Sequence, residues 1–372
     1  MPIEVRPVQL PADAATFIDV WFQLYGNDSH WVPPLKFERK EFLDPAKNPY
    51  FDVASIQCFI AWRDGKAVGT ISAQIDQDYQ AQEPGTGFFG FFEFPDNAEV
   101  SRALFDAAIG WLRIRGMTRA HGPFSFNSNH ECTLLIDGFD SDPLVMMAYN
   151  PKYYLDHYAA LGLGKIKDMY AYWLPNDGPI PDRVGAIADR FEKKHPEVTI
   201  RPVNLKNYEA DVELCRVIYN DAWATNWGFV RLGDAEFAKV AKGLKPMVDP
   251  RYCYFAFVNG EIAGFSLTLP DFNQVVKPMG GSIFPFGWYH WLTRPAKVDK
   301  IRVFTLGIRK KYQHLPLGAP LYKRTWDAGV KAGVKGAEAS WVLEDNHRMR
   351  SAIEKMGGKI YKTYRIFGVE LG

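Results

Sequence analysis

A short loop in the C-terminal part of the chain has the residue pattern of an anion site. Gln313 and Gly318 lie in the stretch 309–319, RKKYQHLPLGA, which follows an apolar strand-like run and precedes a helix-like run. The first backbone amides of a helix have no partners within the helix, and the helix dipole adds positive potential there. The loop is therefore expected to favour an anion. An ordinary turn from strand to helix is the alternative.

Two groups of side chains could accept a proton. His130 and Glu131 stand in an Asn-rich stretch, NSNHE, that is poorly suited to a buried strand. Glu344 and Asp345 close a strand-like run that leads into Asn346. A carboxylate or an imidazole at such a strand end can serve as a general base. The structural alternatives are solvated loop residues for the first group and capping of the helix opened by Asn346 for the second.

No motif in the chain demands a covalent nucleophile or a bound metal. There is no G-x-S-x-G and no H-E-x-x-H. Cys58, Cys132, Cys215 and Cys253 are scattered among apolar neighbours and form no C-x-x-C pair, which is typical of buried thiols in a reducing compartment. We expect no permanently bound cofactor and no metal. Without a signal-peptide pattern or a long uncharged apolar run, a cytoplasmic protein is predicted.

The composition describes a core-rich chain with balanced charge. Of its 372 residues, 47% are hydrophobic and 15% aromatic, and 44 Lys and Arg oppose 43 Asp and Glu. This length predicts two domains of ordinary size. Because nucleic-acid binding needs a clustered basic surface, the net charge of +1 argues against a nucleic-acid partner.

The elements that must position these residues occur twice. The stretch 58–69, CFIAWRDGKAVG, aligns without a gap with 253–264, CYFAFVNGEIAG, at an offset of 195 residues. Each contains Asp-Gly or Asn-Gly between apolar runs, the pattern of a β-hairpin. A second match, at an offset of 194, pairs residues of 164–170 with residues of 358–364. We infer a duplicated domain; two unrelated hairpins with the same turn chemistry are the alternative.

Each half also predicts a long helix that follows a strand. Apolar residues recur at three- and four-residue steps over 98–115 and over 317–332. Strands are expected just before them, at 87–94 and 302–308. The predicted fold class is α/β, with a mixed sheet flanked by helices in each half.

A Pro- and Gly-rich break and two asparagines mark the boundaries. The break, NDGPIP at 176–181, predicts the linker. Domains are therefore expected at 1–178 and 179–372. Asn150 and Asn346 are each expected to cap a helix that precedes the second sequence match.

The C-terminal half resembles the GNAT acyltransferase superfamily. The resemblance rests on the hairpin, the strand ending in FTLGI at 304–308, the loop 309–319 with its helix, and the strand that runs into EDN at 344–346. It implies two tandem GNAT-like domains, each with a mixed, mainly antiparallel sheet, and acyl-CoA as co-substrate. The coenzyme contacts that it implies are Leu306, Gly307, Ile308, Gln313, Gly318, Ala319 and Asn346.

Some positions depart from the family pattern. Pro316 replaces a glycine of the loop and has no amide to donate. Ile353 stands where many GNAT enzymes have a tyrosine that protonates the departing thiolate. Tyr361 or Tyr364 would have to replace that acid, and strand packing is their structural alternative. The corresponding N-terminal loop, FEFPDN at 92–97, is acidic and lacks glycine, so the coenzyme is assigned to the C-terminal domain and the acceptor to the N-terminal one.

Over nearly the whole chain, the sequence is similar to a bacterial group that includes bacterial ceramide synthases. Supporting stretches are WVPP at 31–34, GFFGFFE at 87–93, DGFD at 137–140, Asn150-Pro151 with Tyr153-Tyr154, and KIYKTYR at 359–365. The resemblance implies a role in sphingolipid biosynthesis, the transfer of a fatty acyl group from acyl-CoA to the amine of a sphingoid base. Alternatives are an N-acyltransferase for a small amine, an amino acid or a peptide, and a non-catalytic acyl-CoA or lipid sensor.

One uncharged segment complicates the picture of a purely soluble protein. Residues 279–292, MGGSIFPFGWYHWL, are rich in aromatic side chains, and Lys277, Arg294 and Lys297 flank them. The segment is too short to span a bilayer. Aromatic residues flanked by basic ones suit the surface of an anionic membrane, which predicts peripheral contact with the inner face of the cell membrane. A buried loop is the alternative.

Overall fold

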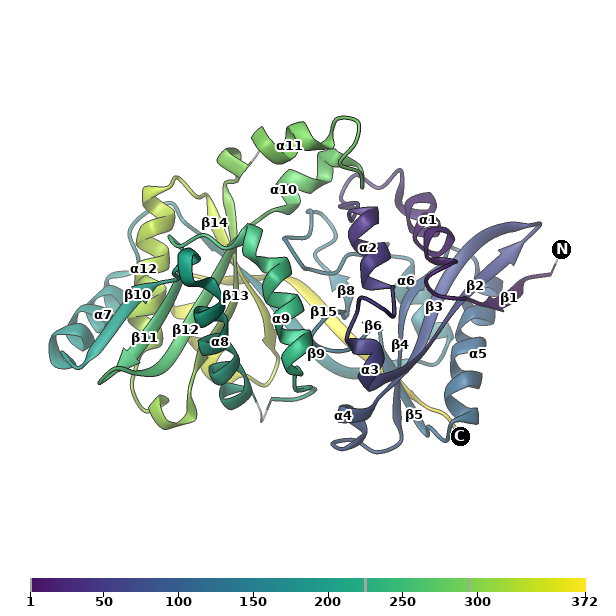
Figure 1. The fold of residues 1–372 in the computed structure, drawn as a ribbon, viewed down its shortest axis with the longest axis horizontal. Coiled ribbons are helices and arrows are strands. Elements are labelled where there is room, and N and C mark those ends of the chain that lie inside the picture. The colour runs from purple at the N-terminus through teal and green to yellow at the C-terminus, as the bar shows by residue number, and fades with distance from the viewer. Residues whose placement is uncertain (1, 224–225, 294) are drawn as a thin grey trace. The chain divides into compact units, whose positions relative to one another are not determined.

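The computed structural model describes residues 2–223, 226–293 and 295–372 (Figure 1). Arg294 lies outside the described residues. The chain forms two compact units. Unit 1 comprises Met1–Asp168, Val276–Leu292 and Lys362–Gly372, and unit 2 comprises Met169–Val275 and Thr293–Tyr361.

The sheet of unit 1 is mixed and mainly antiparallel. Its strand order is β1-β2-β3-β4-β5-β15, and only β4 and β5 run parallel. The strands are β1 (Glu4–Pro7), β2 (Ala54–Arg63), β3 (Lys66–Asp76), β4 (Thr86–Glu93), β5 (Arg119–Gly122) and β15 (Lys359–Glu370). Beside them, β8 (Leu134–Asp137) pairs with β15, and β6 (Phe124–Ser125) pairs with β7 (Glu131–Cys132).

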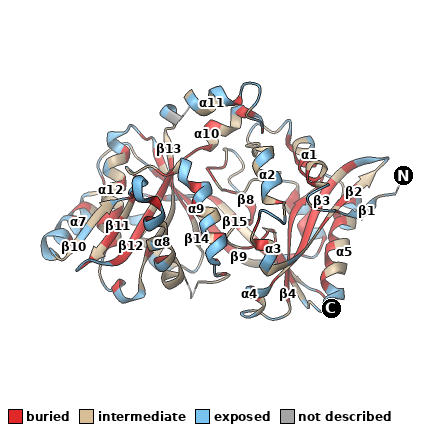
Figure 2. Ribbon diagram, viewed as in Figure 1, coloured by how far each residue is buried: buried red, intermediate tan, exposed pale blue. Residues whose placement is uncertain are grey.

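Several helices of unit 1 pack against this sheet. The helices of the unit are α1 (Ala14–Tyr25), α2 (Lys36–Phe42), α3 (Tyr50–Val53), α4 (Gln77–Gln80), α5 (Ala98–Ile114), α6 (Tyr154–Ala160) and α11 (Gly287–Thr293). In α5, Leu104, Ala108 and Leu112 lie one turn apart and pack in one core cluster with residues of β3 and β4. A second cluster packs α1 against β2. Figure 2 shows these strands as mostly buried.

Unit 2 repeats the same pattern. Its strand order is β10-β11-β12-β13-β14-β9, and only β13 and β14 run parallel. The strands are β10 (Val198–Pro202), β11 (Cys253–Val258), β12 (Glu261–Pro270), β13 (Lys300–Ile308), β14 (Gly336–Leu343) and β9 (Gly164–Pro175). The helices are α7 (Asp182–Lys194), α8 (Tyr208–Ala222), α9 (Asp234–Leu244), α10 (Asn273–Val276), α12 (Gly318–Lys331) and α13 (His347–Lys355).

The two hairpins have the turn that the sequence predicts. Asp64 and Gly65 have φ values of 55° and 76°, and Asn259 and Gly260 have φ values of 51° and 80°. Positive φ at both central residues is the conformation that favours Asp-Gly and Asn-Gly, and its twist matches that of the flanking strands. The predicted fold of two tandem units with mixed sheets is confirmed.

The strand that completes each sheet comes from an unexpected part of the chain. Residues 169–175 of β9 belong to unit 2, where they pair with β14. Residues 362–370 of β15 belong to unit 1, where they pair with β5. These strands carry the second sequence match. The units are thus not contiguous in sequence. The boundary at residue 178, which separates the two sequence repeats, stays a prediction.

One of the two predicted asparagine caps is correct. The Asn346 side chain accepts a hydrogen bond of 3.1 Å from the Met349 amide and caps α13. The prediction for Asn150 is wrong, because α6 begins only at Tyr154 and has no side-chain cap. Instead, the Asn150 amide accepts from Leu135 N at 2.7 Å and donates to Leu135 O at 3.2 Å, which fixes β8. The Asn150 side chain therefore bonds to a strand and not to the start of the helix that the local pattern indicated.

Candidate active site

In unit 2, β13 and β14 separate after a short paired stretch. They pair in parallel from Lys300–Val303 to Gly336–Ala339. Beyond this point β13 continues against β12, and β14 continues against β9. Within the described residues, the facing edges of 304–308 and 340–343 are therefore not paired with each other. An extended ligand could add to such an edge through backbone hydrogen bonds.

Several of the predicted coenzyme residues lie around the loop that joins β13 to α12. Leu306, Gly307 and Ile308 end β13, and α12 begins at Gly318 without a side-chain cap. Gln313 joins the two, because its side-chain amide donates to Ile308 O at 3.2 Å. The loop thus places uncapped amides of a helix N-terminus beside the end of the strand, which suits a phosphate group.

Basic side chains accompany this loop. Lys310 is exposed and makes no ion pair within the described residues, and the Arg348 guanidinium donates to Gln313 O at 3.0 Å. Pro316 accepts a hydrogen bond of 3.1 Å from the Ala319 amide. The amide of Ala319 is therefore engaged within the loop. The remaining positive potential comes from Gly318, the helix dipole and the nearby cations.

A buried charged network lies where β13 and β14 separate. Arg302 and Glu338 are opposite each other in the parallel register and are 1% and 0% exposed. Arg302 donates to the Ser340 hydroxyl at 2.8 Å, and that hydroxyl donates to Glu338 at 2.5 Å. Tyr361, a predicted acid for the departing thiolate, donates its hydroxyl to the same carboxylate. Sequence reasoning gave Glu338 no role, because nothing in its local pattern shows that it pairs with Arg302.

The other C-terminal candidates follow the end of β14. Glu344 is half-buried, and its backbone oxygen accepts from Arg350 at 2.8 Å. Asp345 is exposed, and Asn346 serves as the cap of α13. They are near the strand edge that faces the gap. Tyr364 is different, because it is fully buried in unit 1.

In unit 1 the corresponding gap is filled by the chain itself. β4 pairs with β5 from Thr86 to Phe88, after which β6 lies against β4. A Cβ atom at Gly90 would lie 1.7 Å from Phe124 O, so the two backbones touch. The Gln74 amide holds β6 in place by donating to Phe124 O at 2.6 Å. This part of unit 1 has no room for a ligand that adds as a strand.

Glu93, at the end of β4, is the most unusual carboxylate of unit 1. It is half-buried, and the hydroxyls of Tyr25 and Tyr154 donate to its Oε2 atom at 2.5 and 2.7 Å. Burial raises the pKa of Glu93 to about 7, against the lowering effect of the two tyrosines, and the charge of Glu131 adds to the rise. Sequence reasoning missed this residue. The available signal was a single charge that ends an aromatic strand, GFFGFFE.

The predicted acceptor-side residues lie in the same unit. Glu131 is exposed and accepts a hydrogen bond of 2.8 Å from Arg39, whose side chain is largely buried. His130 bonds to the Asn127 side chain at 3.0 Å, and its ring packs edge-on against Tyr50. Glu131 is within electrostatic reach of Glu93. Of the two predicted residues, Glu131 is thus the one that the structure links to the perturbed carboxylate.

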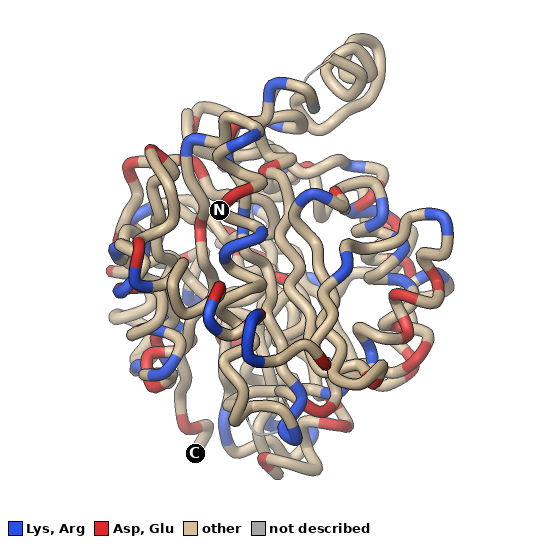
Figure 3. The backbone as a smooth tube through the Cα atoms, turned by 90° about the vertical axis from the view of Figure 1, so that its left-hand side faces the viewer, with Lys and Arg blue, Asp and Glu red and all other residues tan. Residues whose placement is uncertain are grey.

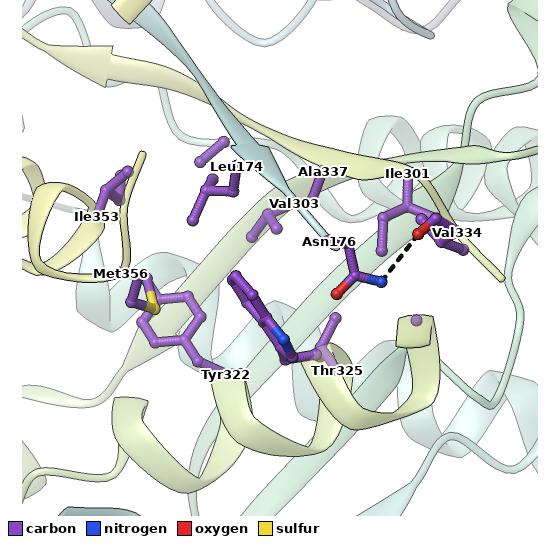
Figure 4. Close-up of a pocket in the computed structure, with 13 residues that line it drawn as sticks. Leu174, Asn176, Ile301, Val303, Tyr322, Thr325, Val334, Ala337, Ile353 and Met356 are labelled. Carbon is purple, nitrogen blue, oxygen red and sulfur yellow. Dashed lines mark hydrogen bonds between the residues drawn. The ribbon is translucent and has the colours of Figure 1, made fainter. Parts of the chain in front are cut away.

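Unit 2 also contains a small apolar cavity between α12 and the sheet (Figure 4). Its volume is about 40 Å³, and its lining includes Ile301, Val303, Tyr322 and Met356. Sites for small molecules are roughly 300–1,000 Å³ in volume. The cavity is therefore a packing feature beneath the loop helix and not a space for an acyl chain. Among the described residues, no three His, Cys, Asp or Glu side chains are grouped as metal ligands.

The comparisons with known proteins place the chain in a family. A bacterial ceramide synthase from Caulobacter vibrioides is 38% identical over 375 residues, which cover 98% of this chain and 97% of that protein. The chain belongs to the bacterial ceramide synthase family. Protein YghO of Escherichia coli K12 is 35% identical and covers 95% of this chain and 92% of its own length. No family model matches the chain.

The solved structures confirm the fold of this family member. A tandem GNAT protein from the clavulanic acid biosynthesis pathway superposes with a TM-score of 0.60 at 14% identity, covering 100% of this chain and 99% of its own. The chain therefore has the tandem GNAT fold, and its family places it among the N-acyltransferases.

Proposed function

We propose that the protein transfers a fatty acyl group from acyl-CoA to the amine of a lipid-like acceptor, with a sphingoid base as the preferred one. The observation that carries the proposal is the contrast between the units. β13 and β14 stop pairing before the uncapped N-terminus of α12, whereas β6 lies against β4 at the corresponding place in unit 1. The relative named as a ceramide synthase supports the choice of acceptor.

In this mechanism the coenzyme is bound through backbone groups. Its diphosphate lies at the loop before Gly318, and its pantetheine arm extends along 306–308. The neutral amine attacks the thioester carbonyl, so that an N–C bond forms and the C–S bond breaks. The amine loses a proton to a base, and the coenzyme thiolate gains one. Because the thioester is already activated, positioning and proton transfer suffice without a covalent intermediate on the protein.

A charge placed at the loop tests the coenzyme site. Gly318→Asp puts a carboxylate at the N-terminus of α12, where a Cβ has ordinary contacts of 3.6 Å with Tyr322. Repulsion of the diphosphate should raise KM for acyl-CoA about tenfold or more. The matched control is Ala98→Asp, which places the same charge at the first residue of α5 in unit 1. Thiol release is measured with acyl-CoAs of graded chain length.

The outcomes of this assay separate the candidate functions. Equal KM values in both variants would contradict a coenzyme site at Gly318. Preference for short acyl chains or for small amines would favour the alternative acceptors. Binding of acyl-CoA without thiol release, across amines that include sphingoid bases, would favour the non-catalytic sensor.

The proposal includes peripheral contact with the inner face of the cell membrane. Phe284 and Phe286 are each 75% exposed, and Trp288, Tyr289 and Leu292 are also exposed. No Asp or Glu occurs between residues 272 and 298, and the coil of α11 at the top of Figure 3 carries no acidic residue. Exposed aromatic residues without negative charge suit an anionic lipid surface. No helix among the described residues is long and apolar enough to cross a bilayer.

A further inference from the structure

Glu93 is a half-buried carboxylate that has no cationic partner among the residues that the structure describes. Its Oε2 atom accepts from Tyr25 and Tyr154, and its Oε1 atom has no hydrogen-bond partner within the described residues. The charged group that acts on it is another carboxylate, Glu131. Holding a carboxylate out of water without a counter-charge is costly. A bound cation would remove that cost.

Aromatic rings pack beside Tyr25, one of the hydrogen-bond partners of this carboxylate. Tyr25 stacks on Trp31 with ring centroids 5.2 Å apart, and the ring of Tyr149 lies 6.5 Å from that of Tyr25. Tyr149 in turn donates to both oxygens of Asp28, at 2.9 and 2.8 Å. Trp31, Tyr149 and Asp28 are half-buried, so they reach solvent. Ring faces beside carboxylates attract an ammonium group.

The position of Glu93 corresponds to a coenzyme position in unit 2. Glu93 pairs with Thr70 on β3, and Gly307 pairs with Phe265 on β12. Thr70 and Phe265 are equivalent in the repeat, at the same offset of 195 residues as Cys58 and Cys253. Unit 1 therefore has a carboxylate where unit 2 has the glycine of the proposed pantetheine edge. At this duplicated position, unit 1 favours a cation beside the Glu93 carboxylate, and unit 2 favours contact with a neutral group through the Gly307 backbone.

A continuous row of rings leads from Glu93 to the exposed aromatic segment. Trp31 contacts Phe22 edge-on, with ring centroids 5.0 Å apart. Phe22 packs against Gly281, where a Cβ atom would lie 2.5 Å from the ring. Gly281 O accepts from Lys36 N at 2.9 Å, which fixes the segment to α2. All these residues belong to unit 1. The ring contacts thus run from Tyr25, the partner of Glu93, to the start of the exposed aromatic segment at Gly281.

We propose that unit 1 contains a binding site for a long-chain primary ammonium, with the ammonium at Glu93 Oε1 and the alkyl chain along Trp31 and Phe22 toward residues 281–292. The inference rests on the proposed function, because it assigns the amine acceptor to this site. It concerns binding in unit 1, and it is tested without an acyl donor.

Calorimetric titration with octylamine, and with 1-octanol as the uncharged analogue, tests the site. The wild-type protein should bind octylamine in preference to 1-octanol. Glu93→Gln keeps the size and the acceptor for both tyrosines but removes the charge, and it should weaken octylamine binding about tenfold or more. Asp106→Asn is the matched control, because Asp106 is an exposed carboxylate on α5 of the same unit. Equal octylamine affinity in the wild type and Glu93→Gln would overturn the proposal.

The pH dependence gives a second readout. The groups that face Glu93 are Tyr25 from α1, Tyr153 just before α6, Tyr154 from α6, and Glu131 from β7. The tyrosines stay neutral near pH 7, because burial raises the pKa of Tyr153 and Tyr154 above 10. Since Glu93 ionises near pH 7, octylamine affinity should rise about tenfold from pH 6 to pH 8 in the wild type and stay flat in Glu93→Gln.

Thiol release, measured separately, distinguishes failure of this site from failure of the proposed function. Acyl transfer by a protein whose octylamine affinity is independent of Glu93 would overturn the site and leave the function standing. Octylamine binding that depends on Glu93, in a protein that transfers no acyl group, would overturn the proposed function and leave the site standing. Melting curves of each variant show that it is folded, and Glu93→Asp, which keeps the charge, should retain the pH dependence.

Discussion

At the scale of single residues, ionised Glu93 lowers the stability of the fold, and the same carboxylate is the proposed partner of a ligand's ammonium group. Folding raises its pKa from 4.5 to about 7, so the folded protein favours the protonated form. Such a group stabilises the fold fully below its unfolded pKa, and this contribution is lost as pH rises through the folded value. The loss falls between about pH 4.5 and 7. An empty site is therefore least favourable to the fold at alkaline pH.

We expect Glu93→Gln to raise the melting temperature at pH 8 and to leave it unchanged at pH 4.5. Glutamine cannot ionise, so it avoids the loss that wild-type Glu93 incurs. Thermal unfolding followed by circular dichroism at the two pH values measures the difference, with Asp106→Asn as the control. A melting temperature at pH 8 that is lower in Glu93→Gln than in the wild type would contradict the assignment of a raised pKa.

The structural role of a residue could be predicted from the sequence where its partners lie nearby along the chain. The turns at Asp64 and Asn259 and the cap at Asn346 depend on neighbouring residues, and all three were predicted. Glu93 and Glu338 escaped prediction because their environment comes from distant segments. Tyr154 lies 61 residues from Glu93 along the chain. Burial and long-range partners decide which of several carboxylates is chemically unusual.

At the scale of elements, one arrangement of strands gives two different gaps. Beyond their paired stretch, no described strand lies between β13 and β14, whereas β6 lies against β4 where β4 and β5 separate. The sequence predicted the helices and the strands around both gaps, because apolar periodicity and turn residues are local signals. The sequence could not predict that residues 124–125 lie where β4 and β5 separate, because this depends on a contact between the backbones of Gly90 and Phe124.

The charged pair that joins β13 to β14 gives a prediction for this scale. Glu338→Gln leaves Arg302 buried without its counter-charge and should lower the free energy of unfolding by about 3–5 kcal/mol. Replacing both residues by methionine removes the unpaired charge and should recover much of that loss. Urea denaturation measures both variants. A double variant as unstable as Glu338→Gln would show that packing, and not the unpaired charge, dominates.

At the scale of the whole molecule, the exposed rings of residues 279–292 predict association with lipid. The triple change Phe284→Ser, Phe286→Ser and Trp288→Ser removes the most exposed aromatic surface and should abolish cosedimentation with anionic vesicles of phosphatidylglycerol. Ile114→Ser is the control, because Ile114 is 85% exposed on α5 and equally apolar. Sedimentation that is unchanged in the triple variant would contradict membrane contact through this segment.

The balanced net charge was a poor guide to such a surface. Composition sums over the whole chain, so it does not reveal a local region that lacks acidic residues. Self-similarity was the more informative signal at this scale, because it predicted two copies of one fold. Which sheet each terminal strand joins could not be predicted, since the two strands share the same sequence pattern.

The exchange of terminal strands has a consequence for how the chain can be divided. Cleavage of any single peptide bond in the predicted linker at 176–181 would leave 169–175 on the fragment that carries most of unit 1 and 362–370 on the other. Neither fragment alone would contain its complete sheet. During synthesis, unit 1 likewise has to wait for its last strand until the whole of unit 2 has been translated. Vectorial, domain-by-domain folding is thus not open to this protein, and its two halves must be expressed as one polypeptide or recombined as complementary fragments.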